Sequence, residues 1–186
     1  MPQQVLKPGQ FRVADLSTRH PTAFDLQPEA DARAAVAAQL NLLGVKKLRF
    51  RGEISPAGAQ GWSLTGALGA TVVQPCVVTL DPVTTRIDEA VERLFVPASY
   101  LEIEAEAGAE TEMPEDTRLE PLGPVISAYD VMIESLSLAL PQYPRRADAD
   151  LGDAVFAEDG VTPLTDEDTK PFAGLAALRD KLDKEE

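Results

Sequence analysis

The chain contains one histidine and one cysteine, the residue types that most often supply a general base and a nucleophile. His20 lies between Arg19 and Pro21 in an expected loop, where a solvated side chain is the simplest interpretation. Cys76 is followed by two valines, an environment in which a thiol usually packs as a small apolar group. The sequence has no P-loop, no glycine-rich dinucleotide turn and no GxSxG motif. It therefore predicts no catalytic residue, no cofactor and no metal site.

Acidic side chains are concentrated in two segments. Residues 102–120 contain eight acids and one base, without the ligand spacing of a calcium loop, and predict a solvated acidic loop. Residues 145–186 contain twelve acids and six bases, whereas residues 45–97 are nearly balanced. The net charge of −14 argues against non-specific attraction of the whole molecule to nucleic acid or anionic lipid.

Basic side chains are the strongest candidates for contacting a partner. Lys47, Arg49 and Arg51 alternate with apolar residues, so a strand would place them on one exposed face, helped by Lys46. Such a row can contact phosphates, although an ordinary solvated strand face remains an open interpretation. Further candidates are Arg86, Arg93, Arg145 and Arg146.

The first third of the chain predicts strands around a helix. Residues 10–16 and 24–26 have short strand patterns. Pro28 is placed as a first helical residue, and the helix is expected to present Ala32, Val36, Leu40 and Leu43 on one face and to stop at Gly44. Residues 46–54 alternate again, and the turn residues at 55–61 predict a hairpin with the strand that starts at Trp62.

Residues 62–82 alternate with a period of two and predict two core strands that meet at Pro75, the second running over 76–80. Residues 83–96 fit a strand or a helix, and the neighbouring strands favour a strand. Residues 98–123 predict a long acidic loop. Ser127 and Asp130 form a capping box, ahead of a helix whose apolar face is Tyr129, Ile133, Leu136 and Leu140 and which Pro141 ends.

These elements predict an α+β fold: a twisted, mainly antiparallel sheet, open or barrel-like, with two main helices packed on it. One domain is expected over 1–146. An acidic, partly flexible tail is expected over 147–186, with an amphipathic patch at 170–182. The first residues lack the apolar core of a signal peptide, and no apolar run reaches membrane-spanning length, so we expect a soluble, cytoplasmic protein without a membrane partner.

Three segments resemble the YceD-like family of large ribosomal RNA subunit accumulation proteins. Residues 74–82 (QPCVVTLDP) are similar to its Q-x-C-V-V-T-L-x-P segment, and residues 126–145 to its I-D-L…E-x-L-x-L-A-L…Y-P-R block. Residues 170–178 (KPFAGLAAL) resemble the N-P-F-A-x-L-x-x-L ending of the alphaproteobacterial branch. The matching positions to which the resemblance gives a structural role are Cys76, Leu80, Pro82, Glu134, Leu138, Tyr143 and Pro144.

This sequence departs from the family at its cysteines. Many members carry Cys-x-x-Cys pairs that look like a zinc ribbon, whereas Cys76 stands alone here and no cysteine follows Arg145. Ser127 replaces an aspartate of the family and can serve the same helix cap. The resemblance therefore implies a member without zinc, whose sheet is held by packing alone.

The resemblance implies a non-enzymatic factor that supports accumulation of 23S ribosomal RNA and assembly of the large subunit. Its partner would be the 23S rRNA precursor or a pre-50S particle. An alternative is an adaptor whose acidic loop and tail bind a basic ribosomal protein without touching RNA. The third hypothesis, an enzyme that uses Cys76 as a nucleophile, has the least support in the sequence.

Overall fold

The computed structural model describes residues 7–58, 60–100 and 119–150. The chain divides into two units after Ala147, and every element below belongs to the first. In chain order the elements are β1 (Gln10–Arg12), η1 (Val13–Asp15), β2 (Thr22–Leu26), α1 (Ala30–Gln39), β3 (Gly44–Ala57), β4 (Gly61–Pro75), β5 (Pro82–Val96), β6 (Leu119–Pro121), β7 (Val125–Ser127) and α3 (Ala128–Ala139). No helix among the described residues is long and apolar enough to cross a membrane.

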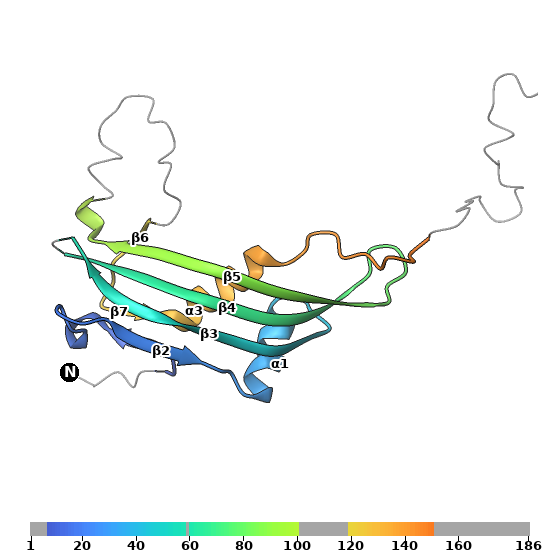
Figure 1. Cartoon of the computed structure of the whole chain (residues 1–186), viewed down its shortest axis with the longest axis horizontal. Helices are drawn as coiled ribbons and strands as arrows, with labels where there is room; N and C mark the ends of the chain where they lie inside the picture. The colour runs from blue at the N-terminus through green and yellow to red at the C-terminus, as the bar shows by residue number, and fades with distance from the viewer. Residues whose placement is uncertain (1–6, 59, 101–118, 151–186) are drawn as a thin grey trace, which may run out of the picture. The chain divides into compact units, whose positions relative to one another are not determined.

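The main sheet has five strands in the order β2-β3-β4-β5-β6 (Figure 1). All neighbours are antiparallel except β5 and β6, which pair in parallel over three residues. The sheet ends at β2 and β6 and does not close, so the barrel-like form is not found. A separate antiparallel ribbon joins β1 to β7. The α+β class and the mainly antiparallel sheet are confirmed.

One hydrophobic core lies between the sheet and its helices. Helix α1 contacts β3, and α3 contacts β4, β5 and β1. From the sheet the core takes the inward residues of each long strand, including Phe50, Leu64 and Leu68, which are at most 2 % exposed. The rings of Phe24 and Phe50 stack at 5.1 Å between centroids. The expected alternation of both β3 and β4 is therefore confirmed.

Two glycines allow β3 and β4 to cross closely under these rings. Gly52 and Gly66 are directly paired on the inward face. A Cβ on Gly52 would overlap the Thr65 carbonyl oxygen and lie 2.6 Å from the Gly66 Cα, and one on Gly66 would lie 2.7 Å from the Phe50 ring. The missing side chains leave the space that Phe24 and Phe50 occupy.

The ends of the first helix and strand differ from the prediction. Helix α1 starts at Ala30, after an N-cap at Glu29, and stops at Gln39. The left-handed backbone of Asn41 (φ 53°) turns the chain, and the Leu43 N–H already donates to Val73 on β4 at 2.9 Å, so Leu43 is exposed in the sheet. Strand β1 stops at Arg12 because β7 offers only three partners, and a 3-10 turn follows.

The predicted strand over 76–80 is wrong. Strand β4 continues unbroken to Pro75, which pairs with Pro82 at the start of β5. The residues between them form a turn, closed by hydrogen bonds from Cys76 N–H to the Asp81 carbonyl (2.7 Å) and from Leu80 N–H to the Cys76 carbonyl (3.0 Å). The hairpin closure overrides the β-propensity of Val77 and Val78. Residues 83–96 are a strand, as favoured.

The later elements agree in part with the sequence. Ser127 caps α3, its Oγ accepting from Asp130 N–H at 3.2 Å. The buried face of α3 is Ala128, Val131, Met132, Ser135 and Leu136, rotated from the predicted one, and Leu140 lies just past its end. The predicted loop over 98–123 is wrong at residues 119–121, which form strand β6. Residues 101–118 and the patch at 170–182 lie outside the described residues.

The close crossing of β3 and β4 predicts an asymmetry between two glycines of β3. Gly52→Ala forces a methyl group into the paired backbone and should destabilise the fold by about 1–3 kcal/mol, as overpacking does. Gly44→Ala is the matched control, since a Cβ at this position would meet no described atom within 4 Å and its φ is not left-handed. Urea unfolding of both variants measures the difference. Equal midpoints for Gly52→Ala, Gly44→Ala and the parent chain would contradict this packing.

Candidate nucleic-acid interface

The outward face of the main sheet carries the predicted basic residues of β3. Lys47, Arg49 and Arg51 are exposed, while Leu48 and Phe50 between them are buried. A bulge separates Lys46, opposite Thr71, from Arg49, opposite Gly69. Because three residues of β3 span two of β4 there, the bulge puts both Lys46 and Arg49 in register with outward residues. Lys47 takes a left-handed conformation (φ 51°) inside it.

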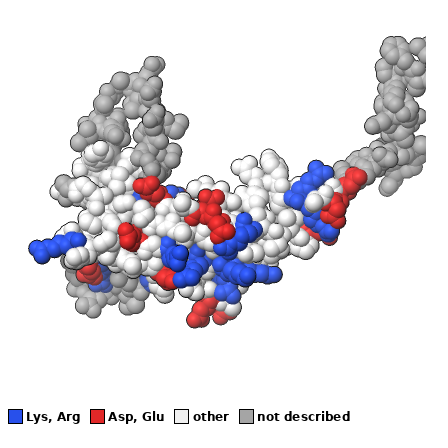
Figure 2. All heavy atoms as spheres, viewed as in Figure 1, with Lys and Arg blue, Asp and Glu red and all other residues white. Residues whose placement is uncertain are grey.

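A groove of about 390 Å³ runs across this face. Its floor includes Ala67 and Gly69 of β4, and its walls carry Lys47, Arg49 and Arg51 on one side and Arg86 with Asp88 of β5 on the other. A Cβ on Gly69 would lie 2.6 Å from Arg86 Nη2, so the exposed Arg86 side chain would have to shift to admit one. Figure 2 shows lysine and arginine side chains gathered over the middle of the sheet. We call this the outer-face groove.

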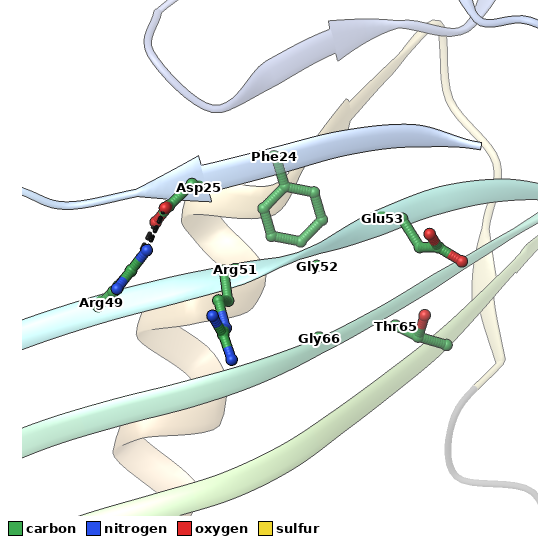
Figure 3. A pocket seen from close by; sticks show the side chains of 8 residues that line it. All are labelled: Phe24, Asp25, Arg49, Arg51, Gly52, Glu53, Thr65 and Gly66. Atoms are coloured by element: carbon green, nitrogen blue, oxygen red, sulfur yellow. Dashed lines mark hydrogen bonds and ion pairs between the residues drawn. The ribbon is translucent and has the colours of Figure 1, made fainter.

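Two carboxylates hold two of its arginines. Arg49 donates to Asp25 of β2 through Nε (2.9 Å) and Nη2 (2.5 Å), and this hydrogen bonding lowers the pKa of Asp25 (Figure 3). Arg86 makes the same forked contact with Asp88, with Nε at 2.8 Å, and lowers the pKa of Asp88 in the same way. The forks fix the planes of both guanidinium groups.

Three cations in or next to the groove have no such partner: Lys47 and Arg51 line it, and Lys46 lies beside it at the bulge. Lys46, Lys47 and Arg51 form no ion pair with any residue that the structure describes. With Arg49 and Arg86 there are five cations in this region. The two carboxylates, Asp25 and Asp88, neutralise two of them, which leaves a surplus of three positive charges. Arg49 and Arg51 also line a neighbouring hollow of about 460 Å³, which Glu53 borders at the other end (Figure 3). The face is therefore basic at the bulge and acidic beyond Arg51.

The other predicted basic residues do not join the groove. Arg93 is paired with buried Leu64 on the inward side, and its 14 % exposed side chain bridges Glu120 of β6 and Glu134 of α3, both at 3.1 Å. Arg145 and Arg146 follow α3, and Arg146 Nη1 binds Asp81 Oδ2 at 3.0 Å. The sequence analysis missed Asp25 and Gly69, whose contacts form across strands, and Asp88, which strand alternation places on the same face as Arg86 two residues away.

The segment around Cys76 is a compact turn next to the end of α3. The thiol is completely buried, and hydrogen bonds, first from the backbone N–H of Arg146 and then from Thr79, lower the pKa of Cys76 to about 6. Val77 N–H donates to the Pro144 carbonyl at 2.9 Å. Of the other positions that share family motifs, Leu80, Leu138 and Tyr143 are exposed, Glu134 binds Arg93, and Pro82 closes the hairpin.

Chemistry at other candidate residues is limited. His20 is exposed, and its backbone N–H donates to Ser17 Oγ at 3.2 Å. Within the described ranges, no group of three or more histidine, cysteine or acidic side chains is placed to hold a metal ion. The geometry of the outer-face groove is thus that of a charged surface for binding an anion.

The lowered pKa of Cys76 predicts a pH-dependent contribution to stability. Its folded pKa of about 6 lies below the ordinary thiol value of 9.0, so folding favours the thiolate. This stabilisation is present above the unfolded pKa and is lost as the pH falls from about 9 to about 6. The melting temperature of the parent chain, minus that of Cys76→Ala, should therefore increase as the pH rises from 6 to 9. A difference between the two melting temperatures that is constant over this range would contradict the hydrogen-bonded thiolate.

Two arginines of β5 should differ in their effect on stability. Arg93→Met removes a mostly buried cation and leaves Glu120, whose pKa burial already raises, beside Glu134 without a counter-charge. We expect a loss of about 1–3 kcal/mol in the free energy of unfolding. Arg86→Met breaks only an exposed pair and should stay close to the parent chain. Similar losses for both variants in urea unfolding would refute the bridging role of Arg93.

The chain matches one family of known proteins. A family model described as large ribosomal RNA subunit accumulation protein YceD matches residues 64–179. The match contains all three segments on which the sequence resemblance rests and confirms it. It includes most of β4 and all of β5 and α3, whereas the cations of β3 precede it. No curated protein and no solved structure matches the chain.

Proposed function

Because the chain belongs to the YceD family of large ribosomal RNA subunit accumulation proteins, we propose that it contacts ribosomal RNA through the outer-face groove. The family name places its role in the accumulation of large-subunit rRNA. The observation that supports the groove is its surplus of three positive charges in a chain whose net charge is −14. The proposed partner is the 23S rRNA precursor, free or in a pre-50S particle.

The chemistry of the groove fits the phosphate backbone better than the bases. Among the described residues no aromatic side chain lines it, so the groove offers no platform there on which bases stack. The fixed guanidinium groups of Arg49 and Arg86 keep further N–H donors for phosphate oxygens, and Arg51 and the two lysines add mobile charge. Since alanine and glycine form the floor, a nucleic-acid strand can approach the backbone of β4. We therefore expect weak dependence on sequence.

The net negative charge of the chain does not exclude this contact. Charges more than about 8 Å apart are largely screened at physiological ionic strength, so acids elsewhere on the chain act weakly at the groove. The acidic end of the same face, marked by Glu53, limits the contact to the half that holds the bulge. The proposed role requires binding alone and no catalytic step.

Binding of rRNA should depend on the unpaired cations of the groove. The variant Lys47→Ser/Arg51→Ser in the full chain should weaken binding of a 23S rRNA fragment by about tenfold. It should also make the slope of log K against log salt less negative by roughly 1.5, the loss of two phosphate contacts. Lys7→Ser/Arg19→Ser, which removes the same charge from exposed positions outside the groove, is the matched control.

Fluorescence anisotropy at several salt concentrations measures both quantities. The proposal predicts that the control pair keeps the affinity and the slope of the parent chain within about twofold. Equal behaviour of the two double variants would mean that the groove is an ordinary solvated face. The adaptor hypothesis would then be the better one, although its acidic segments lie mostly outside the described residues.

A further inference from the structure

Strand β5 has a long edge beside which the structure describes no strand. It pairs with β4 along its whole length, but β6 covers only Leu94–Val96. From Val83 to Arg93 no described strand lies on the other side of β5, which Figure 1 shows along the upper border of the sheet. An unpaired edge presents a row of backbone donors and acceptors, and added strands dock on such edges.

A groove lies between this edge and the last turns of α3. It has a volume of about 250 Å³ and is lined by Ala90 and Val91 of β5 and by Leu138 and Ala139 of α3. Leu138 is 74 % exposed, which is unusual for a leucine beside a core. Ser135 also lines the groove, although its hydroxyl oxygen is buried and has no hydrogen-bond partner in the described part of the chain. The groove thus offers an apolar wall.

The charge around the groove is negative. Glu89 lines it and is exposed. Arg93 also lines it, but its charge is shared between Glu120 and Glu134. Glu89, Glu120 and Glu134 therefore outnumber Arg93 around the groove. Burial and, after it, the charge of Glu134 raise the pKa of Glu120. A cationic partner is therefore favoured over a neutral or acidic one.

We propose that the β5 edge binds an extended basic segment of another protein by strand addition. Glu89, opposite buried Leu68, lies on the same sheet face as Val91 and the groove. Residues two apart in an added strand share one face, so an apolar residue can enter the groove beside Leu138 while a basic residue two positions away reaches Glu89 or Glu134. The groove beside α3 shares no lining residue with the outer-face groove, whose Arg86 and Asp88 lie on the opposite face of β5. A second copy of this chain would bring a second set of the same acids to the edge and is the less suitable occupant.

The test uses the full chain and a fluorescent, capped peptide in which every second residue is threonine and the residues between them are alternately lysine and valine, so that lysine and valine share one face. Glu89→Lys and Leu138→Asp should each weaken binding by about tenfold. Matched controls change the same residue types at exposed positions elsewhere, Glu53→Lys and Leu43→Asp, and should stay within about twofold. Lys47→Ser/Arg51→Ser should leave peptide binding unchanged, which separates this proposal from the RNA contact.

Two further measurements locate the peptide. An analogue with alternate N-methyl groups keeps the charge but cannot pair along its methylated edge, so it should bind at least tenfold more weakly. Hydrogen exchange should slow at amides of 89–93, beside the groove, when the peptide is added. The proposal fails if the control variants weaken binding as much as the test variants do, or if the N-methylated peptide binds as tightly as the parent peptide. It also fails if the peptide slows exchange only at amides outside this edge. Two other results would overturn it: a dimer of the chain alone that protects the amides of this edge, or protection of these amides by rRNA and not by the peptide.

Discussion

The pairing register of β3, β4 and β5 is the constraint on which the rest of the structure depends. Because side chains alternate along a strand, a slip of one residue would turn Phe50 and Leu64 to solvent and bury Arg49 and Arg51. The Gly52–Gly66 pair fixes this register, since only there can the strands cross beneath the rings of Phe24 and Phe50. The same register places Gly69 under Arg86 and so opens the outer-face groove.

The sequence predicted those elements whose signal is periodic and local. The alternation around Phe50 and around Leu64, and the capping box at Ser127, each describe a contact that neighbouring residues decide. The failures depend on partners distant in the chain. Cys76–Leu80 looks like a strand but has no described strand beside it, because Pro75 and Pro82 close the hairpin first. The end of α1 was misplaced because Leu43 bonds to Val73 on β4.

The candidate site shows the same division. Alternation alone put Lys47, Arg49 and Arg51 on one face. It could not show the bulge that brings in Lys46, nor the carboxylate of Asp25, which reaches Arg49 only in the folded sheet. Asp88, two residues from Arg86 on the same strand, is a contact that alternation could have shown. Arg93 looked equivalent to Arg86 in the sequence, yet an odd separation along β5 turns it inward to bridge β6 and α3. The sheet thus uses one arginine to bridge β6 and α3 and leaves another on its outward face.

Contact with RNA through the outward face is most directly tested by mapping the contact on the folded protein. Backbone amide shifts of the isotope-labelled full chain, titrated with a 23S rRNA fragment, report every surface at once. The changes should gather at residues 46–51, 67–69 and 86–88 and leave α1 and α3 unaffected. Changes confined to other surfaces, with the bulge and Gly69 unmoved, would contradict the assignment of this groove to RNA.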